Sequence, residues 1–216
     1  VVLLYRRFVK PEEYRQIGLF AAWGAGIILL MTMGLWLLGG EPNAQTPLVE
    51  SLVWGGMIRH DMVTLVFRVM FIGALILTSL ISMDSPHLQK SEYYGLLIAA
   101  TIGFSLMAAS SDLIMLYIGL ETASISSYVL AGFITKSRRS SEAGMKYFVY
   151  GAFATGVMLY GMSLIYGTAM TLLAELGFGT ANPTNYYVLG SIFQQLGDFA
   201  GQSAASLAEI NGALLL

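Results

Sequence analysis

The stretch IGLFAAWGAGIILLMTMGLWLL, residues 17–38, contains no charged side chain. A helix rises about 1.5 Å per residue, so roughly 20 apolar residues cross the roughly 30 Å of hydrocarbon in a bilayer. The stretch is long enough for that crossing, and it lacks the two-residue alternation of a membrane barrel strand. It therefore predicts a transmembrane helix, and with it an integral membrane protein.

The composition of the whole chain supports a location in lipid. Of the 216 residues, 56% are hydrophobic and only 11% are charged, and the mean hydropathy is +0.69. A soluble domain carries roughly 25% charged residues, so this chain cannot cover its surface against water. It has no cysteine, which excludes thiolate catalysis and iron–sulfur ligation by this chain. The basic residues form no stripe, so nucleic acid is not an expected partner.

Further apolar stretches of membrane-crossing length follow along the chain. They are Met62–Met83, Tyr94–Ala109, Leu113–Ile134 and Ala143–Tyr166. The break Ser110–Asp112 is predicted to be a turn with Asp112 as a helix N-cap, because a single long helix would put Lys136–Arg139 on the wrong side of the membrane. Val1–Tyr5 has the pattern of the end of another span. The expected fold class is an all-α bundle of about six membrane helices, cut at both ends from a longer chain.

The domain organisation is predicted from where the apolar pattern stops. Residues 1–170 are expected to form the transmembrane bundle, residues 171–210 a loop with short surface helices, and residues 211–216 the start of a further transmembrane helix. Asn182–Asn185, with the sequence NPTN, is a turn signal. After it, Tyr186–Phe199 and Ala204–Ile210 show helical spacing with mixed polarity, which indicates helices at a membrane surface.

Basic residues are distributed unevenly among the connections. The connections after Tyr5, Met83 and Ile134 hold eight of the 11 Lys and Arg residues, whereas the connections between them hold one. By the positive-inside rule, the eight basic residues face the cytoplasm or its equivalent.

Three charged residues fall inside the predicted spans: Arg68, Glu121 and Lys146. An ionisable group in hydrocarbon costs several kcal/mol unless it is paired, wetted or neutralised. Glu121 lies about nine residues into its span, roughly 12 Å deep, too far for a short side chain to reach water. Burial favours its neutral form and a nearby cation its charged form, a balance that suits a proton relay. The alternative is a structural carboxylate bonded to an adjacent helix.

Lys146 is the second candidate for the proton relay. It lies about six residues from the basic end of its span, roughly 9 Å in, so partial snorkelling to the membrane surface is the alternative. Glu121 and Lys146 are offset by about 10 Å along the membrane normal, which predicts that they form no tight salt bridge. Arg68, about six residues from the opposite membrane face, is expected to snorkel or to pair with another group.

The most specific motifs lie in Asp112–Gly167. They read DLIMLYIGLETASISSYVLAGF from residue 112 and KSRRSSEAGMKYFVYGAFATGVMLYGMSLIYG from residue 136. This region resembles the N subunit of proton-pumping NADH:quinone oxidoreductase, respiratory complex I. The shared pattern is Gly-Leu-Glu at Gly119–Glu121, a basic connection, and Ala-Gly-Met-Lys-Tyr-Phe at Ala143–Phe148, where Met145 replaces a leucine.

The resemblance implies a larger molecule than this chain. Family members have about 14 helices in two inverted repeats, of which this chain would be the N-terminal half with an incomplete first repeat. Glu121 and Lys146 would move protons, coupled to quinone reduction elsewhere in the complex. The chain would be a non-redox subunit of the enzyme without a cofactor of its own, and quinone, FMN and iron–sulfur clusters would bind to other subunits. Its partners would be other membrane subunits of complex I and the lipid of a bacterial inner membrane, or the organelle equivalent.

Several alternatives remain open at this level. The sister M and L subunits and the multi-subunit cation/proton antiporters share a buried glutamate at this point of the sequence, and the Ala143–Phe148 motif favours the N subunit over them. A standalone secondary transporter would couple ion flow to a solute and would purify alone. A structural membrane scaffold would keep its properties when Glu121 is neutralised.

Overall fold

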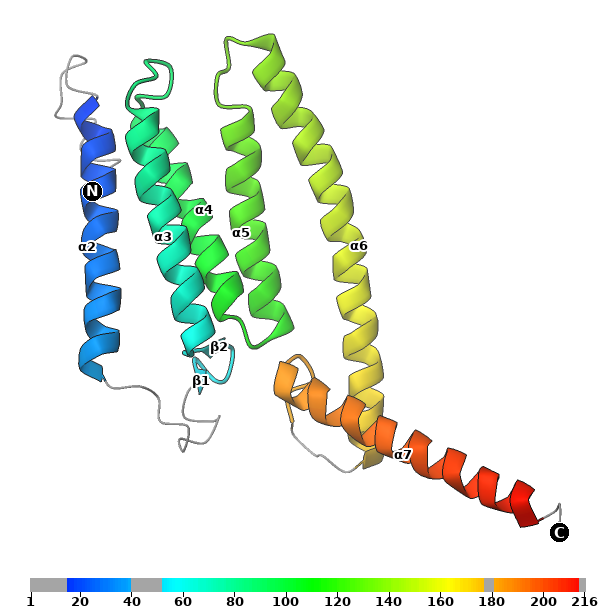
Figure 1. Cartoon of the computed structure of the whole chain (residues 1–216). Helices are drawn as coiled ribbons and strands as arrows, with labels where there is room; N and C mark the ends of the chain where they lie inside the picture. Colours follow the sequence, from blue (N-terminus) through cyan, green and yellow to red (C-terminus); the bar gives the residue numbers. More distant parts are fainter. Residues whose placement is uncertain (1–14, 40–51, 177–180, 214–216) are drawn as a thin grey trace. The chain divides into compact units, whose positions relative to one another are not determined.

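The computed structural model describes residues 15–39, 52–176 and 181–213, which are almost entirely helical (Figure 1). The helices are α2 (Arg15–Gly39), α3 (Met62–Ser82), α4 (Ser91–Ala109), α5 (Leu113–Ala131), α6 (Arg138–Leu176) and α7 (Tyr186–Ala213). Two short strands, β1 (Leu52–Val53) and β2 (Ile58–Arg59), pair in antiparallel fashion. The chain separates into two compact units, residues 1–158 and 159–216, with the boundary inside α6.

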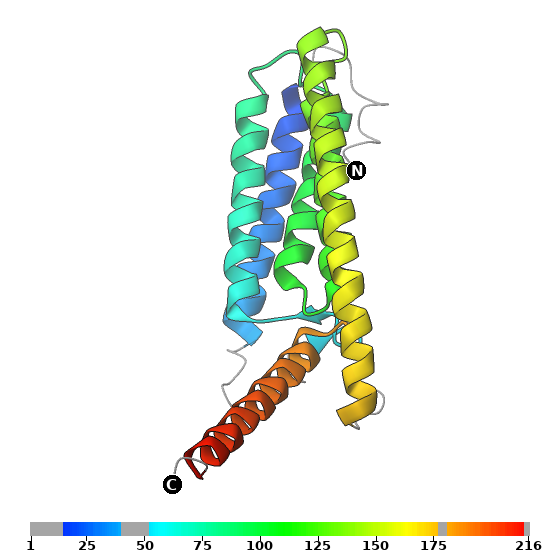
Figure 2. The ribbon, with the colours of Figure 1, turned by 90° about the vertical axis from the view of Figure 1, so that its right-hand side faces the viewer.

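Among the residues that the structure describes, five helices are long and apolar enough to cross a membrane: α2, α3, α4, α5 and α6. They correspond to the five complete spans predicted from the sequence, which confirms an all-α, multi-pass membrane fold. In the first unit, Figures 1 and 2 show α3, α4 and α5 side by side, with successive helices running in opposite directions. The expected further span before Arg6 lies outside the described residues.

The C-terminal part differs from the sequence prediction. The helix expected over Ala143–Tyr166 is longer at both ends, from Arg138 to Leu176. The short surface helices expected within residues 171–210 are instead one helix, α7, of 28 residues. Gly197 and Gly201 fall inside it; glycine costs only about 1 kcal/mol in a helix interior and does not force a break. The helix expected to begin at residue 211 is the last turn of α7, and residues 214–216 lie outside the description.

Polar side chains set the start of α7. The amide of Thr184 donates to Oδ1 of Asn182 at 3.0 Å, which closes a turn, and the amide of Tyr187 donates to Oδ1 of Asn185 at 2.9 Å. The second bond satisfies one of the free amides at the helix N-terminus. The turn predicted from the sequence NPTN is therefore present. Buried residues of the second unit include Ala169 and Leu173 of α6, and Leu189 and Ile192 of α7.

The turn between α4 and α5 is short and buried. Asp112 accepts a hydrogen bond from the amide of Ile114 at 2.8 Å and so caps α5, as predicted. Ser111 donates from Oγ to the carbonyl of Gly56 at 2.6 Å and from its amide to the carbonyl of Met57 at 2.9 Å. Ser111 and Asp112 have no exposed surface. The β1–β2 turn therefore covers the end of the α4–α5 pair.

The sequence did not predict this β-hairpin, because its strands have only two residues each. Its turn requires three successive residues with positive φ: Trp54 (55°), Gly55 (65°) and Gly56 (88°). Glycine adopts this region without a steric penalty, whereas Trp54 accepts an uncommon conformation for a bulky side chain.

Helices α4 and α5 approach so closely that their backbones touch. A Cβ atom on Gly103 would lie 2.5 Å from the amide nitrogen of Ala123 and 2.7 Å from the carbonyl oxygen of Gly119. A Cβ atom on Gly119 would lie 2.8 Å from the amide nitrogen of Met107. Small residues permit this contact, which is how helices associate in lipid without a hydrophobic driving force.

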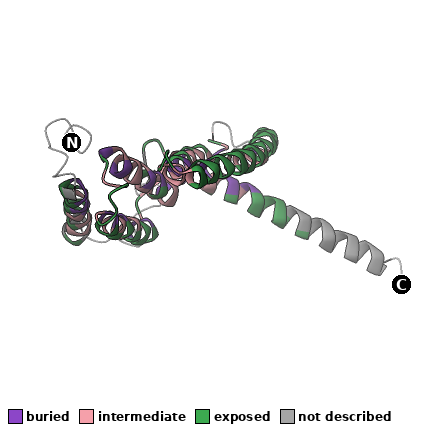
Figure 3. Cartoon of the chain, turned by 90° about the horizontal axis from the view of Figure 1, so that it is seen from above, coloured by how far each residue is buried: buried purple, intermediate pink, exposed green. Residues whose placement is uncertain are grey.

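The core of the first unit lies between α2, α3 and α4. One cluster contains Ile17, Ala21, Tyr93 and Tyr94, and a second contains Ala25, Ile72 and Leu75. Many large apolar side chains nevertheless face outward, among them Trp23 (72% exposed) and Tyr150 (75% exposed). Figure 3 shows the exposed residues in green, including most of α6. This outward apolar surface suits contact with lipid.

Candidate functional site

Glu121 lies near the middle of α5, where it is partly buried. Its carboxylate interacts with the side chain of Tyr117, one helical turn earlier. Tyr117 and Glu121 are four residues apart and therefore share one face of the helix. A tyrosine side chain of the same helix thus lies beside the carboxylate that is predicted to lie deepest in the membrane.

The hydroxyl groups near Glu121 bond mainly to their own helix. Thr122, Ser126 and Ser127 each donate to the carbonyl oxygen four residues earlier, at 2.8 Å in every case. Such bonds satisfy a polar side chain inside an apolar segment. The hydroxyl protons of these three residues are therefore directed toward backbone carbonyls of α5.

Lys146 lies near the start of α6, on a face that is open in the described structure. Its Nζ atom forms an ion pair with Oε1 of Glu142 at 2.6 Å, and the two side chains are 66% and 57% exposed. The pair has the i, i+4 spacing with glutamate on the N-terminal side, the favourable orientation in a helix. Each charge has an opposite charge on its own helix, so Lys146 needs no partner from another helix to be paired.

The structure places Glu121 and Lys146 on consecutive helices and gives each a partner from its own helix. Within the described part of the chain, no ion pair joins the two residues. This arrangement agrees with the prediction that Glu121 and Lys146 form no tight salt bridge. The partners Tyr117 and Glu142 were not singled out from the sequence, although their i, i+4 spacing from Glu121 and Lys146 was a usable signal.

Two aromatic contacts of Tyr128 join the basic ends of α5 and α6. The ring of Tyr128 packs edge-on against Tyr147, with 4.8 Å between the ring centroids, and against Phe148, with 5.9 Å. Nearby, a Cβ atom on Gly144 would lie 2.8 Å from the Cα atom of Gly132. The turn of α6 that precedes Lys146 therefore lies directly against α5.

Arg68 and Asp61 lie on or beside α3. Arg68 is partly buried within the span, and no ion pair to it is found within the described residues. Asp61 caps α3 by accepting from the amide of Thr64 at 2.8 Å, and it pairs with Arg59 at 3.5 Å. Burial works against the charged carboxylate, but the hydrogen bonds from Thr64 and the charge of Arg59 hold the pKa of Asp61 below its ordinary value.

A metal centre does not emerge from the described residues. Among residues 15–39, 52–176 and 181–213, no group of three or more His, Asp and Glu side chains is arranged to hold a metal ion.

The features above define a helical, multi-pass membrane protein with ionisable groups inside its spans. Residues 110–197, which include α5, all of α6 and the first part of α7, match the family described as "NADH:quinone oxidoreductase/Mrp antiporter, TM". The class defined by the fold and by this match is that of antiporter-like transmembrane subunits.

Curated relatives narrow the assignment. NADH-quinone oxidoreductase subunit N 1 of Roseiflexus castenholzii is 36% identical over 195 residues, which is 89% of this chain and 34% of that protein. Subunit N 2 of Symbiobacterium thermophilum is 40% identical over 164 residues, 72% of this chain and 32% of that protein. Subunit N of Trichlorobacter lovleyi is 41% identical over 153 residues, 68% of this chain and 31% of that protein.

The chain spans about a third of the length of the curated relatives it matches. It belongs to the family of antiporter-like membrane subunits of NADH:quinone oxidoreductase, and within that family it is similar to subunit N. The resemblance inferred from Asp112–Gly167 is thereby confirmed.

Proposed function

We propose that this chain is part of a proton-translocating membrane subunit of NADH:quinone oxidoreductase. The observation that carries the proposal is Glu121, a carboxylate in the middle of a membrane-crossing helix and inside the segment that matches the family. An ionisable residue at such a position marks an ion or proton pathway more often than a structural feature. The names of the relatives supply the enzyme to which the pathway would be coupled.

In this proposal Glu121 and Lys146 are the relay groups, and each has a partner that can respond to its charge. Tyr117 lies beside the carboxylate of Glu121, and Glu142 is ion-paired with Lys146. A proton that arrives at Glu121 would remove its negative charge and so weaken its interaction with Tyr117. A proton that leaves Lys146 would remove the positive charge that pairs with the Glu142 carboxylate. The strength of each local interaction would therefore depend on whether the relay group carries its charge.

The proposal assigns no electron transfer to this chain. Quinone, FMN and iron–sulfur clusters would be held by other subunits, and this chain would contribute a proton path without a cofactor of its own. It would assemble with the other membrane subunits of complex I. The bacterial relatives favour the cell inner membrane as its location.

A second candidate function follows from the family description, which also names the Mrp antiporters. In that case the same buried groups would exchange a cation for protons without electron transfer. A sister M or L subunit of complex I is a further alternative within the family. The relatives quoted above are all named subunit N, which favours the first proposal. Co-migration of the full-length protein with quinone-reducing subunits would separate complex I from an antiporter.

The test uses the full-length gene in its native host with the substitution Glu121→Gln, which keeps the shape and removes the charge. We expect the subunit to assemble, and both quinone reduction and proton uptake by inverted membrane vesicles to fall by about tenfold or more. Asp84→Asn, in the connection after α3, is the matched control and should leave both rates near wild type. Wild-type rates in the Glu121→Gln variant would make the carboxylate structural and end the proposal.

A further inference from the structure

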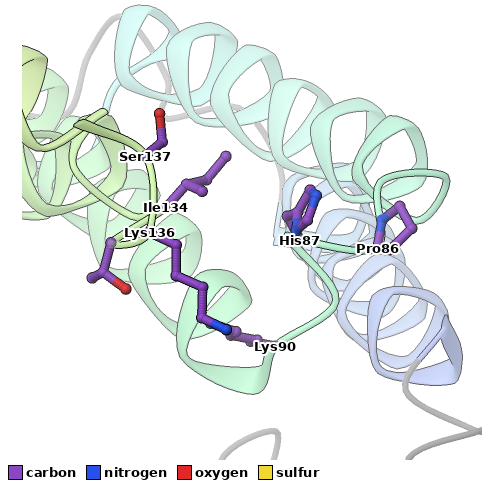
Figure 4. A pocket seen from close by; sticks show the side chains of 7 residues that line it. Pro86, His87, Lys90, Ile134, Lys136 and Ser137 are labelled. Atoms are coloured by element: carbon purple, nitrogen blue, oxygen red, sulfur yellow. The ribbon is translucent and has the colours of Figure 1, made fainter. Parts of the chain in front are cut away.

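Two connections on the basic side of the first unit enclose a pocket of about 480 Å³ (Figure 4). One wall comes from the connection between α3 and α4, and the other comes from the connection between α5 and α6. The lining residues are Pro86, His87, Lys90, Ile134, Thr135, Lys136 and Ser137. The proton-relay proposal uses none of these residues.

The pocket carries an excess of positive charge. Lys136 is exposed, and no ion pair to it is found in the described part of the chain. The Nζ atom of Lys90 lies 5.4 Å from the centre of the Phe133 ring, which is a cation–π contact. Glu92 is not among the residues that line this pocket; it lines an adjoining hollow with Lys90. An anion in the pocket would therefore meet Lys136 without a competing carboxylate among the lining residues.

The adjoining hollow, of about 340 Å³, combines apolar side chains with Lys90 and Glu92. It shares Lys90 and Thr135 with the basic pocket, and Val129 and Phe133 at the end of α5 form its apolar surface. The cationic pocket thus adjoins the apolar side chains of Val129 and Phe133 at the end of a membrane-crossing helix. This order of chemistry matches a phospholipid, whose charged headgroup lies at the membrane boundary and whose acyl chains run inward.

We propose that the pocket binds the phosphate group of an anionic phospholipid. Lys90 and Lys136 pair with the phosphodiester, the hydroxyl of Thr135 lies within the same lining, and the first part of an acyl chain runs along Val129 and Phe133. Free phosphate would meet the same cations but would gain nothing from the apolar side chains. The inference stands apart from proton translocation, because it depends only on the membrane fold and on the two connections.

The experiment uses the purified full-length protein in nanodiscs of phosphatidylcholine that contain a small fraction of photoactivatable phosphatidylglycerol. After illumination, mass spectrometry locates and quantifies the attached lipid. The wild type should be labelled within Val129–Ser137. The double variant Lys90→Gln/Lys136→Gln should bind the probe about fivefold more weakly for each lysine removed.

Two further variants make the result specific. Arg138→Gln/Arg139→Gln removes the same charge from exposed positions outside the pocket and should keep labelling close to wild type. Lys90→Arg/Lys136→Arg keeps the charge and should retain most of the binding. Equal loss in both glutamine variants would mean general attraction to the basic surface and would overturn the proposal, as would labelling that maps elsewhere.

Two competition arms distinguish the source of the phosphate. Inorganic phosphate should compete poorly with the lipid probe; displacement at similar concentrations would indicate a free-anion site instead. Photoactivatable phosphatidylcholine should label the pocket much more weakly than phosphatidylglycerol. Equal labelling by the two lipids would show that the pocket ignores headgroup charge, which contradicts the proposal.

Discussion

Helices α4 and α6 are both apolar and both neighbours of α5 in the chain, yet they contact it very differently. Between α4 and α5, Gly103 and Gly119 have no side chain, so the two backbones meet and no space is left for a Cβ atom. Between α5 and α6, the described contacts lie around Tyr128, Gly132 and Gly144 near the connecting loop. None of the membrane-length window of α6 is buried, compared with 28% of the corresponding window in α4 and in α5.

The comparison shows that apolar character alone does not bring helices together in a membrane. Lipid tails are as apolar as a leucine side chain, so an apolar surface gains little by leaving lipid for another helix. Close packing arises where glycine lets backbones approach. The face of α6 that includes Lys146 is exposed, so it is not a helix-packing surface like the one between α4 and α5.

The largest expected effect comes from breaking the α4–α5 contact with Gly103→Leu. A Cβ atom at residue 103 would already overlap the backbone of Ala123. We expect a loss of stability of about 3 kcal/mol, the upper range for an overfilled core. Thermal unfolding of the full-length protein in detergent measures the loss. Gly156→Leu on α6, where no atom lies within 4 Å of the added Cβ, is the matched control and should be close to neutral. Equal losses would erase the contrast between the two helices.

A smaller effect is expected at Asp61, the N-cap residue of α3. The pKa of Asp61 is lower in the folded chain than its ordinary value of 3.8, so the unfolded chain takes up the proton more readily. The stability contributed by the charged carboxylate is therefore fully present above the ordinary value and is lost as the pH falls through the lowered one. At neutral pH, Asp61→Asn should cost about 0.5 kcal/mol, since asparagine still caps a helix and solvent screens the charge.

The pH dependence is what distinguishes a charge effect from a packing effect at Asp61. Thermal unfolding of wild type and Asp61→Asn, measured from roughly pH 3 to 7, should show the difference shrinking toward the acid end. A difference that stays constant over this range would assign the effect to packing.

The smallest stability effect is expected on the open face of α6, from Glu142→Gln. The pair with Lys146 is exposed, and such i, i+4 pairs contribute about 0.3 kcal/mol. If the relay proposal holds, proton uptake in vesicles should fall far more than stability does, because Lys146 loses the group that balances its charge. Unchanged proton uptake would show that the pair serves only the helix surface.

The span pattern could be predicted from the sequence because length and apolar character are enough to define a membrane helix. The turn at Ser110–Asp112 was also predictable, since a cap residue and the distribution of basic residues agreed on it. The length of α7 was not, because Gly197 and Gly201 weaken a helix without forcing it to end. The β1–β2 hairpin escaped prediction because its hydrogen bonds to Ser111 join segments far apart in the chain.

The site was predictable only in part. Glu121 and Lys146 stand out because charges are rare in apolar spans, and the structure places both on the predicted helices. Their roles in proton transfer remain a prediction. The contacts of Tyr128 could not be read from the sequence, because a tyrosine at that spacing is as compatible with a lipid-facing position as with a helix contact.

The short buried turn at Ser110–Asp112 also bears on the order in which the chain acquires its structure. Helices α4 and α5 are adjacent in sequence and meet along complementary glycines, so their pairing closes only a small loop. Pairs of low sequence separation form quickly and early. During synthesis the two helices can associate as a hairpin before α6 has left the ribosome, and the hairpin then offers α6 a preformed surface around Tyr128 and Gly132.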